Sequence, residues 1–153
     1  HTGRISKFVG DSLVYFTFMR ISNDFGKNWD SKWIGNQEDI FESNPRDIDR
    51  IKILTKRKII AALQFGLIIR SEDGGNSWDS TFFDEKRHCT AFSFFDTLHG
   101  TIYYEFDKYL LNTNDGGITW NKIDLPYNDD RIKDGYYIWS INSIHKQILI
   151  MSV

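Results

Sequence analysis

The octet Ser71-Glu72-Asp73-Gly74-Gly75-Asn76-Ser77-Trp78 decides the fold of this chain of 153 residues, because near copies of it stand before and after it. The earlier copy is Ser22-Asn23-Asp24-Phe25-Gly26-Lys27-Asn28-Trp29, and the later copy is Thr113-Asn114-Asp115-Gly116-Gly117-Ile118-Thr119-Trp120. All three read Ser/Thr-x-Asp-x-Gly-x-x-Trp, and the successive aspartates are 49 and 42 residues apart. Internal repetition with a period of about 40 to 50 residues indicates a propeller, a solenoid or an array of similar units.

Each octet has the composition of a tight turn between two β-strands. Glycine follows the aspartate by two residues and permits the positive φ that a hairpin turn needs. The aspartate carboxylate can accept hydrogen bonds from amides of its own turn, and the Ser or Thr hydroxyl can add another. The tryptophan offers a large apolar surface that can hold the turn against its sheet. The pattern therefore predicts a structural role for Ser22, Asp24, Gly26, Trp29, Ser71, Asp73, Gly75, Trp78, Thr113, Asp115, Gly117 and Trp120.

A calcium site is the alternative for these turns, since 112–117 superficially resembles a calcium-binding loop. An EF-hand loop needs oxygen ligands at alternating positions, a glutamate at its end and a helix on each side. None of the octets supplies that set. We therefore predict no metal site and no cofactor.

The composition excludes several classes of protein. Hydrophobic residues make up 41% of the chain, aromatic residues 16%, and there are only 2 prolines, which predicts a folded, β-rich protein. A net charge of −2, from 19 Lys and Arg against 21 Asp and Glu, leaves no basic footprint for a nucleic-acid partner. No apolar stretch is long enough for a membrane span. The single cysteine, Cys89, cannot form an internal disulfide.

The segments around the octets predict an all-β chain built from units of four consecutive antiparallel strands. The first unit has expected strands at 5–9, 12–17, 18–22 and 29–34, the second at 50–55, 59–65, 67–70 and 78–83, and the third at 90–95, 101–105, 109–113 and 120–125. Two further strands are expected at 136–142 and 147–153. We predict one region, 1–153, with units at about 4–35, 47–84 and 90–125 and an incomplete unit at 136–153.

Further predictions concern two connecting segments and the last expected strand. The polar segment 36–50 is expected to be a loop with one helical turn, and Lys56-Arg57-Lys58 a solvated turn between strands. The strand expected at 147–153 would leave an edge with unpaired backbone groups, which proteins usually cover. The repeat spacing places a next octet aspartate at about residue 159 to 161. We therefore expect residues after Val153, or pairing of this edge with another chain.

The octets resemble the Asp box, or bacterial neuraminidase repeat, of β-propellers. In the third unit, Phe94-Phe95-Asp96-Thr97-Leu98-His99-Gly100 followed by the octet at 113–120 is similar to the repeat of photosystem II assembly factors and their bacterial relatives. The resemblance extends over essentially the whole chain. It implies a partial or truncated β-propeller, blades that are four-stranded antiparallel meanders, and an extracytoplasmic or secreted location.

The same resemblance raises sialidase chemistry, which needs an arginine triad, a Tyr/Glu pair and an acid/base aspartate. Arg4-Ile5-Ser6 lacks the proline of that family's Arg-Ile-Pro segment. Acidic pairs such as Asp129-Asp130 are expected in loops, where adjacent side chains diverge into solvent. His88, His99 and His145 show no spacing typical of zinc ligands. We therefore predict no catalytic residues.

Aromatic side chains are dense in the last third of the chain, and strand alternation directs some of them outward. The candidate binding aromatics are Tyr127, Tyr136, Tyr137 and Trp139. Our hypothesis is a non-catalytic β-propeller scaffold for binding or assembly, with a protein or a glycan as its ligand. The alternative is a part of a sialidase-like or other glycoside-hydrolase propeller.

Overall fold

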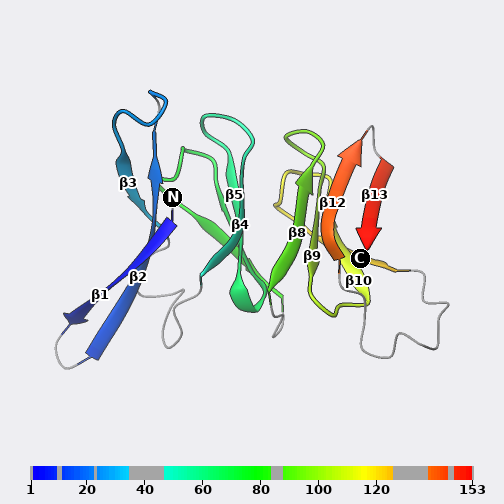
Figure 1. The fold of residues 1–153 in the computed structure, drawn as a ribbon, viewed down its shortest axis with the longest axis horizontal. Coiled ribbons are helices and arrows are strands. Elements are labelled where there is room, and N and C mark those ends of the chain that lie inside the picture. The colour runs from blue at the N-terminus through cyan, green and yellow to red at the C-terminus, as the bar shows by residue number, and fades with distance from the viewer. Residues whose placement is uncertain are drawn as a thin grey trace.

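The computed structural model of the chain describes residues 2–9, 12–22, 24–34, 47–83, 88–125, 138–144 and 147–152. Within these ranges the chain is all-β, and its antiparallel sheets stand side by side along the longest axis of the molecule (Figure 1). Consecutive strands pair with each other, so each sheet is a meander. No helix in the described ranges is long and apolar enough to cross a membrane.

The strands fall into sheets that we number in chain order. The first sheet contains β1 (Thr2–Val9), β2 (Ser12–Ile21) and β3 (Asp30–Trp33). The second contains β4 (Ile48–Ile53), β5 (Ile59–Leu63), β6 (Leu67–Ser71) and β7 (Asp79–Phe82), with the short 3-10 helix η1 (Gln64–Gly66) between β5 and β6. The third contains β8 (Cys89–Phe94), β9 (Gly100–Tyr104), β10 (Tyr109–Thr113) and β11 (Asn121–Asp124), and the fourth contains β12 (Ile138–Ile144) and β13 (Gln147–Ser152).

The second and third sheets confirm the predicted four-stranded meanders, but the prediction for the first sheet is wrong in one respect. Residues 12–17 and 18–22 were expected to form separate strands, whereas β2 runs without a break from Ser12 to Ile21. Residues 12–21 contain no Gly, Pro, Asn or Asp that could make a turn. The described part of the first sheet therefore has three strands. The helical turn expected in 36–50 falls mostly outside the described residues.

The sheets pack face to face, because successive residues of a strand point to opposite faces. In the second sheet, Ile59, Ala61 and Ile69 pack with Met19 and Ile34 of the first sheet. The intervening positions face the other way: Ile60, Ala62 and Ile68 pack with the third sheet through Ile102, Tyr104 and Leu111. The third sheet repeats the arrangement by packing Ala91, Tyr103 and Leu110 against Ile138 and Ile141 of β12. A strand that is buried on both faces explains the uninterrupted apolar run of β5.

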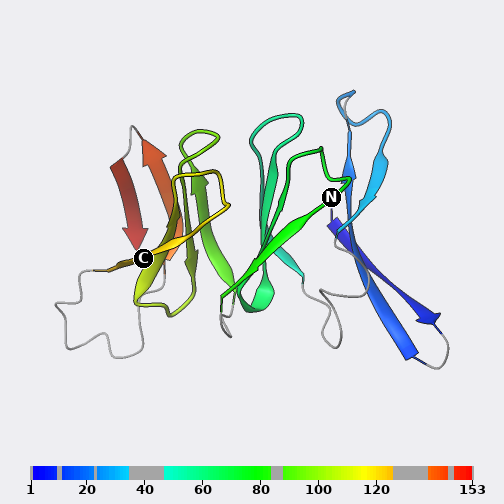
Figure 2. The same ribbon diagram turned by 180° about the vertical axis from the view of Figure 1, so that it is seen from behind.

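The first strands of successive sheets lie next to each other. Arg50 Nη2 on β4 donates to the Thr90 carbonyl of β8 at 3.0 Å, and Thr90 Oγ1 donates to the Ile138 carbonyl of β12 at 2.7 Å. The last strands, β7 and β11, lie on the opposite side and face the viewer in Figure 2. The second and third sheets therefore each have an inner edge at their first strand and an outer edge at their last strand.

We predict that the face-to-face packing provides most of the stability. Ile69→Ala should lower the free energy of unfolding by about 2 to 5 kcal/mol, because the fully buried side chain leaves a cavity between two sheets. Ile53→Ala is the matched control, since Ile53 belongs to the same sheet but is exposed; it should change the same quantity by less than about 1 kcal/mol. Urea unfolding measures both, and equal losses would contradict this account of the core.

Candidate functional site

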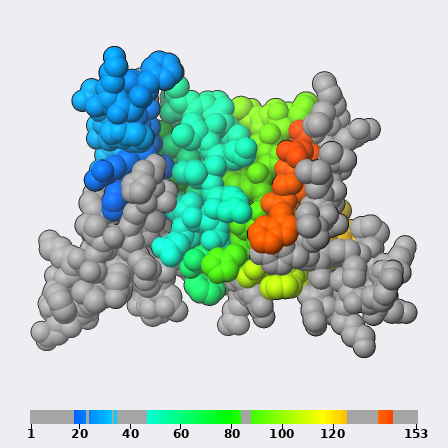
Figure 3. Space-filling model, in the orientation of Figure 1, coloured from blue at the N-terminus to red at the C-terminus, as the bar shows by residue number. Residues whose placement is uncertain are grey.

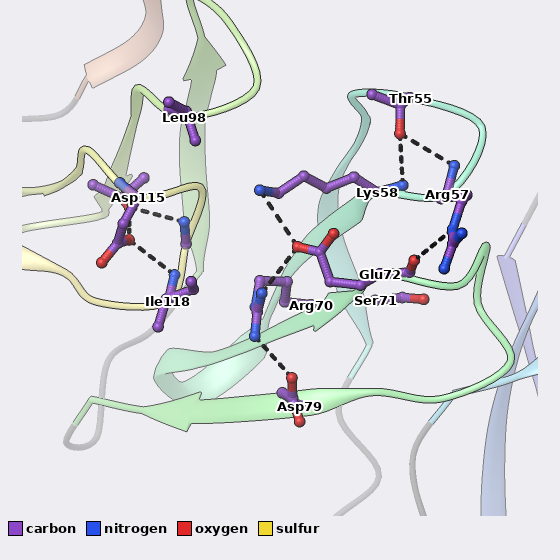
Figure 4. Close-up of polar contacts among 12 residues, drawn as sticks. Thr55, Arg57, Lys58, Arg70, Ser71, Glu72, Asp79, Leu98, Asp115 and Ile118 are labelled. Carbon is purple, nitrogen blue, oxygen red and sulfur yellow. Dashed lines mark hydrogen bonds and ion pairs between the residues drawn. The ribbon is translucent and has the colours of Figure 1, made fainter.

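The three octets form the turns between β2 and β3, between β6 and β7, and between β10 and β11. We call them the first, second and third octet turns (residues 22–29, 71–78 and 113–120). In the third turn, Asp115 Oδ1 accepts from the Ile118 and Thr119 amides, both at 3.0 Å (Figure 4). The Thr119 hydroxyl donates to Asp115 Oδ2, and Thr113 Oγ1 donates to Asp115 Oδ1 at 2.8 Å. The aspartate thus closes the turn with its own side chain.

The hydroxyl that opens each octet has a second partner inside the turn. Thr113 Oγ1 accepts from the Gly117 amide at 2.8 Å, and Ser71 Oγ and Ser22 Oγ accept from the Gly75 and Gly26 amides, each at 2.7 Å. The other two aspartates accept hydrogen bonds within their own turns in the same manner: Asp73 from the Ser77 amide and Asp24 from the Asn28 amide. Both oxygens of each octet aspartate are therefore engaged within its turn.

These hydrogen bonds hold the carboxylates in their ionised form. In the second and first turns, hydrogen bonds from Ser77 and Asn28 lower the pKa of Asp73 and of Asp24 from the ordinary 3.8. Burial raises the pKa of Asp115, but the hydrogen bonds from Thr119, Thr113 and Ile118 outweigh it and bring this pKa down to about 2. A general acid for glycoside hydrolysis needs the opposite shift. The octet aspartates are therefore suited to holding the turn and not to donating a proton.

In the second and third turns, the glycine two residues after the aspartate lies against the preceding sheet. Gly75 and Gly117 have φ of 89° and 86°, which side chains disfavour. A methyl group on Gly117 would lie 3.1 Å from Ile60 Cδ1 of the second sheet, and one on Gly75 would lie 3.2 Å from Met19 Cε of the first. Glycine is therefore needed at these positions both for the backbone conformation and for the close approach of two sheets.

The tryptophans of the octets are buried to very different extents. Trp120 is 8% exposed in the core between the second and third sheets, and Trp78 is partly buried against the core between the first and second. Trp29 is 52% exposed, and its Nε1 donates to the Gly26 carbonyl at 3.0 Å. The described residues provide no sheet on that side of the first sheet. Burial of this tryptophan therefore depends on the neighbouring sheet and not on the octet alone.

The prediction of a solvated turn at Lys56-Arg57-Lys58 is wrong for Lys58. Its side chain is only 13% exposed and lies 3.4 Å from Glu72, which Arg70 also contacts at 2.9 Å (Figure 4). Arg70 binds Asp79 as well, at 2.8 Å. A methyl group on Gly116 would overlap Lys58 Nζ, so this lysine reaches the third octet turn from the second sheet. The ion pairs lie within the second sheet, whereas the approach to Gly116 joins two different sheets, so sequence spacing gave no sign of it.

A cleft of about 400 Å³ opens between the first and second sheets beside their octet turns. Ile21, Ile53 and Ile59 provide its apolar lining, and Lys32 and Lys56 its cationic groups. Lys32 Nζ donates to Asn76 Oδ1 of the second octet turn at 2.6 Å, which joins the first sheet to that turn. The cleft is large enough for a side chain or a small ligand.

Two histidines are paired with carboxylates that sequence reasoning did not associate with them. His88 Nδ1 lies 3.1 Å from Asp49 Oδ1, and His99 Nδ1 lies 2.8 Å from Asp96 Oδ2. The hydrogen bond that His88 makes to the Asp49 carboxylate raises the pKa of His88, and the charges of nearby acidic side chains add to this shift. Asp49 Oδ2 also accepts from the Cys89 amide at 2.7 Å, while burial raises the pKa of the Cys89 thiol. In the part of the chain that the structure describes, no group of three His, Cys, Asp or Glu side chains is placed to hold a metal ion.

Of the four candidate binding aromatics, only one can be located. Trp139 is exposed near the start of β12. Tyr127, Tyr136 and Tyr137 lie outside the described residues.

No protein-family model matches this chain, and no curated protein matches it. A solved structure described as "YCF48 bound to D1 peptide" is similar, with a TM-score of 0.55 and 19% sequence identity. The match covers 72% of this chain and 38% of that chain. YCF48 is a photosystem II assembly factor with a β-propeller fold. Together with the stacked four-stranded meanders, this likeness shows that the sheets are blades of a β-propeller.

We predict a pH dependence of stability from the third octet turn. Because folding lowers the pKa of Asp115 to about 2, its contribution is complete above the ordinary value of 3.8 and is lost as the pH falls toward 2. Asp115→Asn should therefore lower the free energy of unfolding at neutral pH by about 1 to 2 kcal/mol, as the loss of a capping carboxylate does. The deficit should shrink between pH 4 and pH 2.

Asp124→Asn serves as the control, since Asp124 is exposed on β11 and should change stability by less than about 0.5 kcal/mol. Thermal unfolding at a series of pH values measures both variants. A deficit for Asp115→Asn that stays constant down to pH 2 would contradict the capping role.

Proposed function

We propose that this chain is part of an Asp-box β-propeller that acts as a non-catalytic scaffold and binds a protein partner. The observation that carries the proposal is the use of the octet carboxylates: both oxygens of Asp73 and of Asp115 accept hydrogen bonds inside their own turns. The repeated motif therefore serves the framework. The surfaces that it leaves open are aromatic and mixed-charge ones suited to recognition.

The choice of a protein over a glycan rests on the solved structure described above. By its description, YCF48 in that structure is bound to a peptide. At 19% sequence identity, the likeness shows only that the two proteins share a fold. That this chain also binds a protein is our own proposal. No observation on the described residues favours the glycoside-hydrolase alternative.

We assign to the binding surface the exposed Trp139, together with Tyr127, Tyr136 and Tyr137 as predicted from the sequence. Figure 3 shows that the coloured residues of β12 (orange) and of the second sheet (cyan) lie open on one face. Large aromatic side chains are the usual anchors of protein interfaces. The edge strand β13, which pairs with β12 alone among the described strands, is a second proposed contact for another chain.

A capture experiment tests the proposal. The immobilised protein is exposed to native extract from its source that is untreated, enzymatically deglycosylated or digested with protease. We expect the same captured partner in the first two samples and none in the third, with at least about fivefold less captured by Trp139→Ala, since an aromatic anchor is worth about 1 kcal/mol or more. Phe25→Ala is the control, because Phe25 is exposed in the first octet turn, away from the proposed surface.

Three results would contradict the proposal: capture that deglycosylation abolishes, the absence of any captured protein, and hydrolysis of sialosides or β-glucans that a single Asp or Glu substitution removes. The first result would point to a glycan ligand and the last to an enzyme.

A further inference from the structure

The cleft between the first and second sheets has cationic groups with unused hydrogen-bond donors. Its polar lining includes Lys32 and Lys56 together with the carboxylates of Asp30 and Asp73. Lys56 is exposed, and among the described residues no carboxylate is paired with its ammonium group. Lys32 Nζ donates to Asn76 Oδ1 at 2.6 Å, which leaves two of its three N–H groups for another acceptor. Both lysines are therefore able to bind a further anionic group.

The repeat allows this cleft to be compared with the corresponding place between the second and third sheets. Residues of successive units are matched by their position in or next to the octet. The backbone supports the match, since a methyl group on Gly74 would lie 3.1 Å from the Lys56 carbonyl oxygen and one on Gly116 2.8 Å from the Thr97 carbonyl oxygen. The matched pairs are Ile21 with Arg70, Asn23 with Glu72, Asp30 with Asp79, Asp73 with Asp115, and Gly74 with Gly116.

Side chains fill the corresponding place between the second and third sheets. Lys58 Nζ lies against Gly116, where a methyl group would overlap it, and is 3.4 Å from Glu72 Oε1. Arg70 Nη1 lies 2.9 Å from the same oxygen, and Figure 4 shows the Glu72 carboxylate between the two cations. The side chains of Lys58 and Arg70 are only 13% and 15% exposed. A carboxylate held by two cations therefore closes this place.

The aspartates of the cleft do not prevent a carboxylate from binding beside them. The corresponding aspartates, Asp79 and Asp115, are present between the second and third sheets, and Glu72 is held there all the same. Both carboxylate oxygens of Asp73 already accept hydrogen bonds within the second octet turn, so this group does not compete for Lys56. Each place thus has two cations and two aspartates. The cleft differs in lacking the further carboxylate, because the first octet has asparagine where the second has glutamate.

We propose that the cleft binds an acidic side chain, Asp or Glu, of a protein partner. Its carboxylate would lie between Lys32 and Lys56, in the manner of Glu72 in the second unit. An apolar residue next to it would cover Ile53, which is 62% exposed in the lining of the cleft. A volume of about 400 Å³ accommodates such a pair of side chains. The inference rests on the proposed function, because it names the chemistry by which the scaffold recognises its partner.

A peptide titration followed by nuclear magnetic resonance tests the cleft. The probe is an acetylated heptapeptide with one glutamate between two leucines, and its counterpart has glutamine in place of the glutamate. The glutamate peptide should shift the amide signals of Lys32, Lys56 and Gly74. It should also bind about three- to fivefold more tightly than its counterpart, the gain typical of an exposed ion pair. This difference should shrink at high ionic strength, because salt screens exposed charges.

Charge substitution at Lys56 identifies the residue that binds the carboxylate. Lys56→Gln should weaken binding of the glutamate peptide about three- to fivefold and leave binding of the glutamine peptide unchanged. Lys56→Glu should weaken the glutamate peptide further, and it should bind a peptide with lysine in place of the glutamate more tightly than the wild type does. Both variants should fold, since the side chain of Lys56 is exposed.

Lys52→Gln and Lys52→Glu are the matched controls. Lys52 is an exposed lysine of the same sheet, but it does not line the cleft. These variants make the same changes of net charge, so a general electrostatic attraction would affect them equally. They should bind all three peptides like the wild type.

Several results would overturn the inference: no shift of the amide signals around the cleft, equal binding of the glutamate and glutamine peptides, unchanged binding in Lys56→Glu, or an equal loss in Lys52→Glu. Free glutamate that binds as tightly as the peptide would assign the cleft to a small molecule instead. Failure here is distinguishable from failure of the proposed function, since a protein partner captured equally by the wild type and by Lys56→Glu would reject the cleft alone.

Discussion

The hydrogen bonds inside each octet turn are the interaction on which the rest of the structure depends. A hydroxyl at the first position accepts from the amide of the glycine, and the aspartate accepts from the amides that follow. These bonds hold the glycine at positive φ, and in the second and third turns this glycine lies in contact with the preceding sheet. The carboxylates therefore act on the packing between blades, although none of them lies in the core.

The stacking of sheets follows from this constraint together with strand alternation. Each inner sheet is apolar on both faces, so neither face is stable without a neighbour, and the second sheet packs with the first through one set of residues and with the third through the other. Trp29 illustrates the dependence, since its octet turn has the usual hydrogen bonds but its ring stays half exposed. In the proposed function, recognition falls to the ends and edges of the sheets, where the fold makes fewer demands on side chains.

The sequence allowed the prediction of the repeat, the hairpin turns and most strands, because these depend on local patterns of two to eight residues. The continuity of β2 was also within reach of the sequence, since no turn-forming residue interrupts residues 12–21, and the prediction of a break there was wrong. Contacts between sheets could not be predicted from the sequence. The pairing of Asp49 with His88 joins residues 39 positions apart on two sheets, and their approach is set by the stacking.

The most direct test of the central claim is native-state hydrogen exchange at the octet glycines. The amides of Gly75 and Gly117 donate to the Ser71 and Thr113 hydroxyls in buried surroundings, whereas the Gly26 amide makes the same bond in an exposed turn. If the turns hold neighbouring sheets together, Gly75 and Gly117 should exchange as slowly as the central amides of β6 and β10, and Gly26 should exchange much faster. Rapid exchange at Gly75 and Gly117, at the rate of an exposed loop, would contradict the account.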